Sequence, residues 1–141
     1  GNDKIKHFKK LAVREGVAER VYFLGGRNDI PELLAASDIL LHPAYHENTG
    51  TVLIEALAAG LPVIVTEVCG YSFHIKNADA GKIIPSPFQQ KTFNNILLSM
   101  LTSEKKRDWK NNGKKYIDSM DIFRMPEKIA DIIEGLQPGK F

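Results

Sequence analysis

The chain has 141 residues, of which 43% are hydrophobic and 26% charged, and its formal net charge is +2 at pH 7. This length fits one domain and this composition can bury a core, so the chain is not a disordered tail. The small net charge gives no case for nucleic-acid binding, and the single cysteine excludes an internal disulfide and a cysteine-only metal cluster. The four histidines lack metal-site spacing. We therefore expect neither a metal nor a nucleic-acid partner.

No run approaches the roughly 20 apolar residues that a membrane-spanning helix needs, and no signal-peptide pattern opens the chain. We therefore expect a cytoplasmic location. The chain begins without a methionine, and a helical pattern starts almost at once from Ile5. We expect a piece of a longer protein.

Apolar periodicity predicts alternating helices and strands along the chain. This alternation is typical of a three-layer α/β fold, a parallel sheet with helices on both faces. The expected helices cover Ile5–Glu15, Ile30–Ala36, Gly50–Ala59, Phe88–Leu101, Ser103–Ser119 and Pro126–Gly135, and the expected strands cover Val21–Leu24, Ile39–Leu41, Pro62–Thr66 and Lys82–Ile84.

The segment from residue 42 to residue 65 is the most informative part of the chain. Pro43 ends the preceding strand because proline cannot donate to a ladder. Asn48 or Thr49 is expected to cap the helix that follows, and Gly60 is expected to end it. Two carboxylates, Glu47 and Glu55, thus stand around one helix start between two strands.

Glu55 lies in a helix whose other residues are mostly apolar on every side, so we expect that helix to be largely buried. A carboxylate there needs a partner. One interpretation pairs Glu55 with an arginine or lysine, or lets it reach solvent. The other gives its two oxygens to the hydroxyl groups of a sugar.

Glu47 precedes the helix, in a loop at the carboxyl end of a strand, where open α/β sheets bind their ligands. The backbone N–H groups of Gly50 and Thr51 at the helix start favour an anion such as phosphate. This turn therefore has the groups to hold a sugar, a phosphate and a ribose.

Two other loops are candidates for the same cleft. Gly26 and Arg27 follow the first expected strand, and Arg27 either faces a diphosphate or forms a surface ion pair with Asp29 or Glu32. The loop Thr66–Ser72 follows the third expected strand and should line the cleft beside the motif loop. We interpret its cysteine, Cys69, as a small packed thiol and not as a nucleophile.

The basic segment between Lys105 and Lys115 invites two interpretations. A solvated outer face, with Trp109 and Tyr116 packed inward, is the simpler one. Docking on an anionic inner membrane is the alternative.

The pair Glu47 and Glu55, with seven residues between them, resembles the motif of the retaining glycosyltransferases of family 4, in which a glycine and proline stop and another strand follow. Gly50 stands at the glycine that this motif usually contains, whereas Ala44 and Thr49 replace the common serine and phenylalanine. The similarity covers mainly Phe23–Tyr71, and a weaker similarity is found at residues 125–128. It is strongest to the branch of lipopolysaccharide core glucosyltransferases that adds the first glucose to the inner-core heptose.

The resemblance implies the Rossmann-like C-terminal half of a GT-B enzyme, truncated at its N-terminus, with a partial nucleotide-sugar-binding domain over residues 1–120 and a crossover segment over residues 121–141. Glu47 would contact hydroxyls of the transferred sugar as the catalytic-site residue, and Glu55 the ribose. UDP-glucose would be the donor substrate, with no cofactor. The donor-binding set implied is Glu47, Asn48, Thr49, Gly50, Thr51, Glu55, Gly70, Tyr71, Gly26 and Arg27.

By the same resemblance, the acceptor would be the lipopolysaccharide core, bound mainly by an N-terminal domain outside this chain, together with the basic residues that hold the diphosphate. The isolated chain would then be folded but inactive. Two alternatives are a nucleotide-sugar epimerase of similar build and a non-enzymatic, flavodoxin-like binding module.

Overall fold

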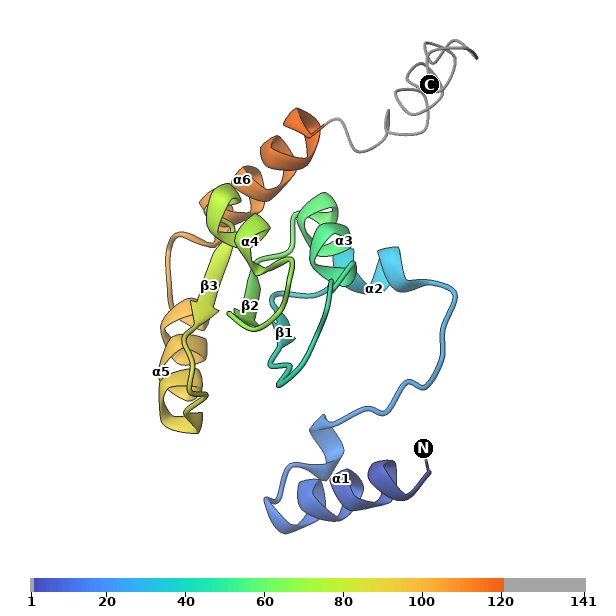
Figure 1. Ribbon diagram of the computed structural model, residues 1–141. Coiled ribbons are helices and arrows are strands. Elements are labelled where there is room, and N and C mark those ends of the chain that lie inside the picture. Colours follow the sequence, from blue (N-terminus) through green and yellow to red (C-terminus); the bar gives the residue numbers. More distant parts are fainter. Residues whose placement is uncertain (1, 121–141) are drawn as a thin grey trace, which may run out of the picture. The chain divides into compact units, whose positions relative to one another are not determined.

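The computed structural model describes residues 2–120 (Figure 1). The chain divides into two compact units, Gly1–Ile30 and Pro31–Phe141. The expected helix over Pro126–Gly135 and the expected crossover segment over 121–141 lie outside the described residues.

The first unit contains helix α1 (Asn2–Arg14) and a short 3-10 helix, η1 (Ala18–Arg20). The strand expected over Val21–Leu24 is wrong. Val21 has an extended backbone, but the segment pairs with no described strand, and the side chains of Tyr22 and Leu24 are exposed. An extended segment becomes a strand only through a ladder of hydrogen bonds to a neighbour, and apolar sequence alone does not supply that neighbour.

The second unit is built on a three-stranded parallel sheet in the order β1-β2-β3, with β2 in the middle. The register pairs Leu40 with Val63 and Ile64 with Lys82. The predicted fold class, a parallel sheet with helices on both faces, is confirmed. The elements are α2 (Ile30–Ala35), β1 (Leu40–His42), α3 (Val52–Ala59), β2 (Val63–Thr66), α4 (Ser72–Ala78), β3 (Gly81–Ile84), α5 (Gln90–Leu101) and α6 (Lys106–Ser119).

Side chains of β2 alternate between two hydrophobic cores, one on each face of the sheet. Val63 and Val65 pack with α3 and α4, whereas Ile64 packs with Phe93 of α5 (Figure 1). All four residues of β2 are buried, as expected of a central parallel strand. Because β1, β2 and β3 follow one another in chain order, their two crossover helices lie on the same face.

Helix α4 was not among the predicted elements. It has only seven residues, and its N-cap residue Tyr71 makes no side-chain capping hydrogen bond, so the sequence offers no start signal. It ends at Asp79, which has a left-handed backbone with φ of 44°. A signal was nevertheless available, because parallel strands need a crossover of a dozen or more residues, which is usually helical.

Candidate functional site

Two loops leave the carboxyl ends of adjacent strands and meet at one edge of the sheet. The motif loop, residues 43–50, follows β1, and the second loop, residues 67–71, follows β2. The hydroxyl of Thr66 at the end of β2 donates to the carbonyl of Ala44 at 2.6 Å and thereby anchors the start of the motif loop. The two loops lie side by side, as their positions in the sequence predict.

Backbone hydrogen bonds join these loops further along. The N–H of Gly70 donates to the carbonyl of Glu47 at 3.2 Å, and the N–H of Tyr71 donates to that of Thr49 at 2.9 Å. Glu47 and Cys69 form an isolated parallel bridge, and the Cys69 thiol donates to the Thr49 carbonyl at 3.4 Å. Glu47 therefore stands on a backbone that the second loop holds in place.

Two glycines make this close approach possible. A Cβ at Gly70 would lie 1.9 Å from the carbonyl oxygen of Asn48, and one at Gly50 would lie 2.6 Å from Cys69 Sγ. Gly50 also has a φ of 82°, in the left-handed region that glycine adopts at no steric cost. Both positions thus have a structural requirement for glycine, whatever they contact in a ligand.

The predicted cap of α3 by Asn48 or Thr49 is wrong. The N-cap residue is Thr51, without a side-chain capping hydrogen bond. The left-handed turn at Gly50 delays the start of the helix, and the carbonyl of Thr49 accepts hydrogen bonds from the second loop. The predicted end of α3 is confirmed, because Gly60 is its left-handed C-cap.

The start of α3 presents free backbone donors. Within the described residues, no hydrogen bond uses the N–H of Gly50 or Thr51, whereas the N–H groups of Leu53 and Ile54 bond within the first turn. Free N–H groups at a helix start favour an anionic group. The arrangement therefore suits the phosphate expected from the sequence.

The Glu47 side chain is about a third exposed, at 36%, and its Oε2 lies 4.0 Å from His42 Nε2. That ring nitrogen is closed off from solvent and has no hydrogen-bond partner among the described residues. Sequence reasoning considered His42 only as a metal ligand and missed this approach. The available signal was its position, at the end of a predicted strand and directly before the motif loop.

Glu55 lies in the first turn of α3 and is exposed. The expectation that this helix is largely buried holds on one face, where Leu53, Ala56 and Leu57 are buried, whereas Glu55 and Ala58 are exposed. The carboxylate of Glu55 has no ion-pair or hydrogen-bond partner in the described part of the chain. Of the alternatives left open, no charged partner is present among the described residues, and the carboxylate reaches solvent, where a ligand can also contact it.

Gly26 and Arg27 belong to the first unit, so their place in the site stays a prediction. Arg27 Nε donates to Asp29 Oδ1 at 2.6 Å, and a second bond joins its Nη2 to Oδ2. This pairing raises the pKa of Arg27 and lowers the pKa of Asp29. The surface ion pair that the sequence offered as an alternative is thus formed.

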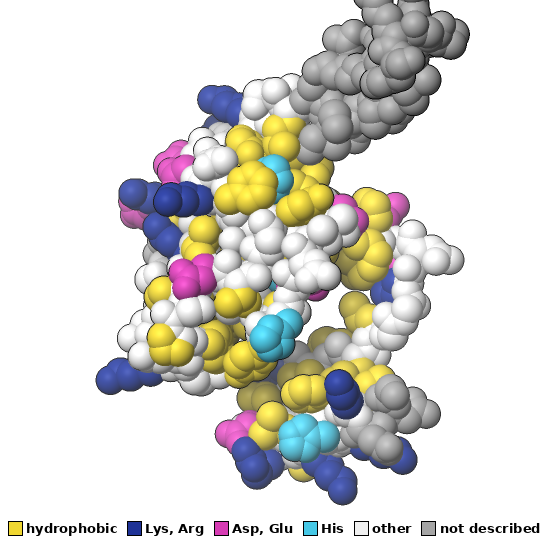
Figure 2. Space-filling model, viewed as in Figure 1, with side chains coloured by type: hydrophobic (Ala, Val, Ile, Leu, Met, Phe, Trp, Pro, Cys, Tyr) yellow, Lys and Arg dark blue, Asp and Glu magenta, His cyan; other side chains and the backbone are white. Residues whose placement is uncertain are grey.

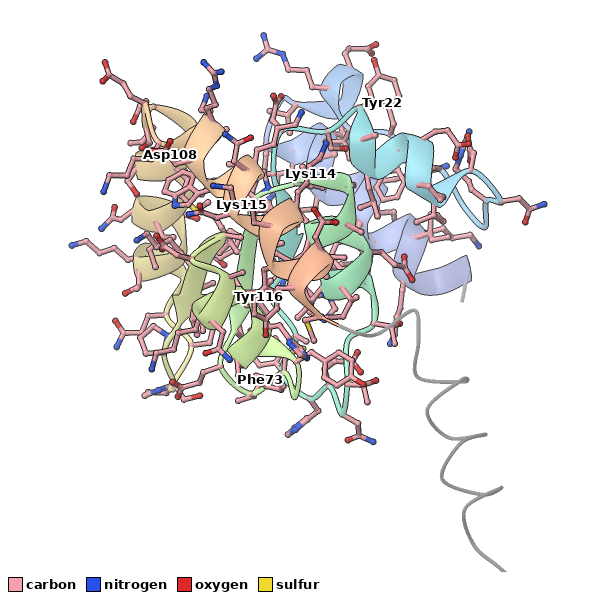
Figure 3. All side chains as sticks on the ribbon, turned by 90° about the horizontal axis from the view of Figure 1, so that it is seen from above. Tyr22, Phe73, Asp108, Lys114, Lys115 and Tyr116 are labelled. Atoms are coloured by element: carbon pink, nitrogen blue, oxygen red, sulfur yellow. The ribbon has the colours of Figure 1, made fainter. Side chains whose placement is uncertain are left out.

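Next to the second loop, Tyr71 belongs to an aromatic cluster with Phe73, His74 and Tyr116. The rings of Phe73 and His74 have their centroids 3.9 Å apart, and His74 Nδ1 is hydrogen-bonded to the Tyr116 hydroxyl at 2.9 Å. Figure 3 shows the labelled Phe73 and Tyr116 at one end of the second unit. Burial lowers the pKa of His74, so its ring is neutral at pH 7.

Cys69 is buried within the core, and burial raises the pKa of its thiol, with a smaller contribution from the charge of Glu47. Because the thiolate is the nucleophilic form, a raised pKa disfavours nucleophilic chemistry. The interpretation of Cys69 as a packed thiol agrees with this environment.

The basic helix α6 packs on α3. Trp109 is buried and Tyr116 packs against the core, as predicted. The side chains of Lys110 and Lys114 lie over Gly60, where the C-terminal carbonyls of α3 favour positive charge. On the face of the second unit shown in Figure 2, basic and acidic side chains are interspersed.

Within residues 2–120, no group of three histidine, cysteine, aspartate or glutamate side chains is arranged to hold a metal ion. None of the helices described is long and apolar enough to cross a membrane.

Comparison with known proteins identifies relatives over almost the whole chain. The family described as "Glycosyl transferases group 1" matches residues 1–116. The lipopolysaccharide glucosyltransferase WaaG of Escherichia coli K12 is 48% identical over 136 residues, which cover 96% of this chain and 36% of that protein.

Solved structures agree with this similarity. The crystal structure of WaaG superposes with a TM-score of 0.83 at 48% identity, covering 92% of this chain and 35% of that one. Anabaena Alr3699/HepE, solved in complex with UDP-glucose, superposes with a TM-score of 0.79 at 27% identity, covering 96% and 38%. The chain thus spans little more than a third of the length of these relatives.

Proposed function

Because the chain belongs to the glycosyl transferases group 1 family, we propose that it is the donor-binding part of a longer retaining glycosyltransferase. Its sheet and helices match the GT-B enzymes. The longer protein transfers glucose from UDP-glucose to the heptose of the lipopolysaccharide inner core, a proposal supported by the 48% identity to WaaG. The family match favours this function over the epimerase and the flavodoxin-like module that the sequence left open.

The observation that carries this proposal is the joined pair of loops at the carboxyl edge of the sheet. Hydrogen bonding from the second loop holds the backbone of Glu47 while its carboxylate stays partly exposed. The free N–H groups of Gly50 and Thr51 and the unpaired carboxylate of Glu55 follow within the same strand–loop–helix unit. Carboxylates, which accept from hydroxyls, and N–H groups, which donate to phosphates, are the groups that a nucleotide sugar requires.

In this proposal the sugar donor, UDP-glucose, spans the start of α3. Glu47 accepts hydrogen bonds from hydroxyls of the transferred glucose, the helix start binds the diphosphate, and Glu55 accepts from the ribose. The two loops supply further contacts with the nucleotide sugar through Asn48, Thr49, Gly70 and Tyr71. Gly26 and Arg27, in the first unit, stay in the proposed set on the sequence alone.

During transfer, the bond between the anomeric carbon of glucose and the diphosphate oxygen breaks, and a bond to an acceptor hydroxyl oxygen forms. Negative charge develops on the departing diphosphate, and the N–H groups of the helix start stabilise it, together with basic residues outside this chain. Glu47 positions the donor and is not a covalent nucleophile. We assign the reaction no metal and no cofactor, with UDP-glucose as a substrate.

The acceptor is bound mainly by parts of the longer protein outside this chain, so we expect the isolated chain to bind donor without transferring sugar. Because the acceptor is a lipid, we place the enzyme in the cytoplasm, at the inner face of the inner membrane. Exposed lysines of α6 that do not cover α3 contribute at most a weak contact with anionic headgroups.

Saturation-transfer NMR of this chain with millimolar UDP-glucose, ADP-glucose and UDP tests the proposal. We expect transfer to ribose and glucose protons, with UDP-glucose preferred, and loss of both signals in Glu55→Ala. Glu32→Ala is the matched control, because Glu32 is also exposed and lies in the first turn of its own helix, α2. Equal signals in the two variants would contradict the role of Glu55. Absence of transfer to the protons of every nucleotide tested, from both the folded chain and its longer parent, would overturn the proposal.

A further inference from the structure

His42 carries a polar atom for which the described part of the chain provides no hydrogen bond. Its Nε2 is closed off from solvent, and within residues 2–120 its one ion-pair contact is with Glu47 Oε2 at 4.0 Å. Buried polar atoms in native proteins are almost always hydrogen-bonded, so an unpaired one calls for a functional explanation.

The distance to Glu47 exceeds that of a normal hydrogen bond, about 2.9 Å, by roughly 1 Å. The backbone on both sides is fixed, because His42 pairs with Val65 in the sheet and the carbonyl of Glu47 accepts from Gly70. The Glu47 carboxylate, in contrast, is partly exposed and no hydrogen bond to a described residue holds it. A change of its side-chain torsions alone can therefore close the gap.

No other described group competes for this contact. The Cys69 thiol lies beside the motif loop, but it donates to the carbonyl of Thr49 and not to the Glu47 carboxylate. Glu47 makes no side-chain hydrogen bond within the described residues, and its contact with His42 is its one ion pair there. The buried nitrogen and the carboxylate are thus each other's available partners.

We propose that His42 is a positioning residue for Glu47: its ring Nε2–H donates to Oε2 and directs the other carboxylate oxygen toward the hydroxyls of a bound hexose. This inference rests on the proposed function, since it assigns the sugar to Glu47. A carboxylate held in one orientation loses less conformational freedom on binding. His42 therefore raises affinity for the sugar portion of the donor and leaves affinity for the nucleotide unchanged.

The first test needs no ligand. Long-range ¹H–¹⁵N spectra of the histidine rings report which nitrogen carries the proton. We expect the Nε2–H form for His42, and we expect its ring ¹⁵N shifts to change in Glu47→Leu while those of His74, held by Tyr116, stay in place. A protonated Nδ1 with bare Nε2, or His42 shifts that ignore Glu47→Leu, would overturn the inference.

The second test compares dissociation constants for UDP-glucose and UDP. We expect His42→Leu to weaken UDP-glucose binding about tenfold, as for loss of a hydrogen bond to a charged group, and UDP binding less than about twofold. His42→Gln, whose amide nitrogen can reach the place of Nε2, should restore UDP-glucose affinity to within about threefold of the unmodified chain. His46→Leu, an exposed neighbour in the same loop, is the control and should change neither.

The outcomes separate the inference from the proposed function. Equal weakening for both nucleotides, or His42→Gln as weak as His42→Leu, would show a merely structural role and overturn the inference alone. Binding of neither UDP nor UDP-glucose by the unmodified chain would overturn the proposed function and the inference with it. Amide ¹H–¹⁵N spectra confirm that each variant is folded before its affinity is interpreted.

Discussion

The contact between the motif loop and the second loop is tested most directly by Gly70→Ala. The added methyl carbon would lie 1.9 Å from the carbonyl oxygen of Asn48 and 3.0 Å from its carbonyl carbon. Both are backbone atoms, so no side-chain rotation relieves the overlap. The two loops must move apart.

The size of the effect follows from these distances. Moving the methyl carbon from 1.9 Å to 3.0 Å, the shortest separation that real Cβ atoms show, requires a shift of 1.1 Å. The same shift would break the bonds from Gly70 N–H to Glu47 at 3.2 Å and from Tyr71 N–H to Thr49 at 2.9 Å. Losing two hydrogen bonds at about 1 kcal/mol each, with about 1 kcal/mol of residual strain, lowers the free energy of unfolding by about 3 kcal/mol.

For a chain of this size, that loss lowers the melting temperature by about 10 °C. Thermal unfolding followed by circular dichroism measures it, and the fluorescence of Trp109, the single tryptophan, reports on the second unit. Gly26→Ala is the control, because a Cβ there meets no atom within 4 Å, and we expect it to change stability by less than about 0.5 kcal/mol. If the melting temperature of Gly70→Ala equals that of Gly26→Ala, the reasoning is refuted.

Three further outcomes are expected. Gly81→Ala, whose Cβ would lie 1.9 Å from the Val63 carbonyl in the β2–β3 ladder, should destabilise by about 2–3 kcal/mol; the explanation fails if its melting temperature is unchanged. Burial lowers the pKa of His74, so the stability that depends on its neutral ring is present above about pH 6.5 and is lost as the pH falls further; the drop in unfolding free energy between about pH 7.5 and 5.5 should be smaller in His74→Gln. Burial raises the pKa of the Cys69 thiol, so a disulfide reagent at about pH 8 should react slowly with the folded chain and fast in denaturant; equal rates would contradict its burial.

Local sequence signals were sufficient where the chain's own neighbours decide the structure. Gly60 and Pro62 end α3 because a left-handed residue and a ring without an N–H act on the residues beside them. The short apolar runs before Pro43 and after Leu61 became β1 and the buried strand β2, and their order along the chain brought their two loops to one edge. The sequence therefore placed the Glu47–Glu55 motif correctly in a strand–loop–helix unit.

Tertiary structure decided the features that depend on distant residues. Val21–Leu24 has the composition of a strand but no ladder partner among the described residues, and α4 forms through packing on β3 and α6 without a cap of its own. The outward direction of Glu55 follows from the face of α3 that α6 and the sheet cover.

The unpaired nitrogen of His42 also needs the folded chain to be seen. It exists because β1 pairs with β2 while the second loop holds Glu47 nearby. Strand pairing and burial depend on contacts between residues far apart in sequence, whereas turns and helix ends depend on residues within a few positions. The sequence alone therefore identified the family and the candidate carboxylates, and only the fold placed a histidine beside one of them and left the other exposed.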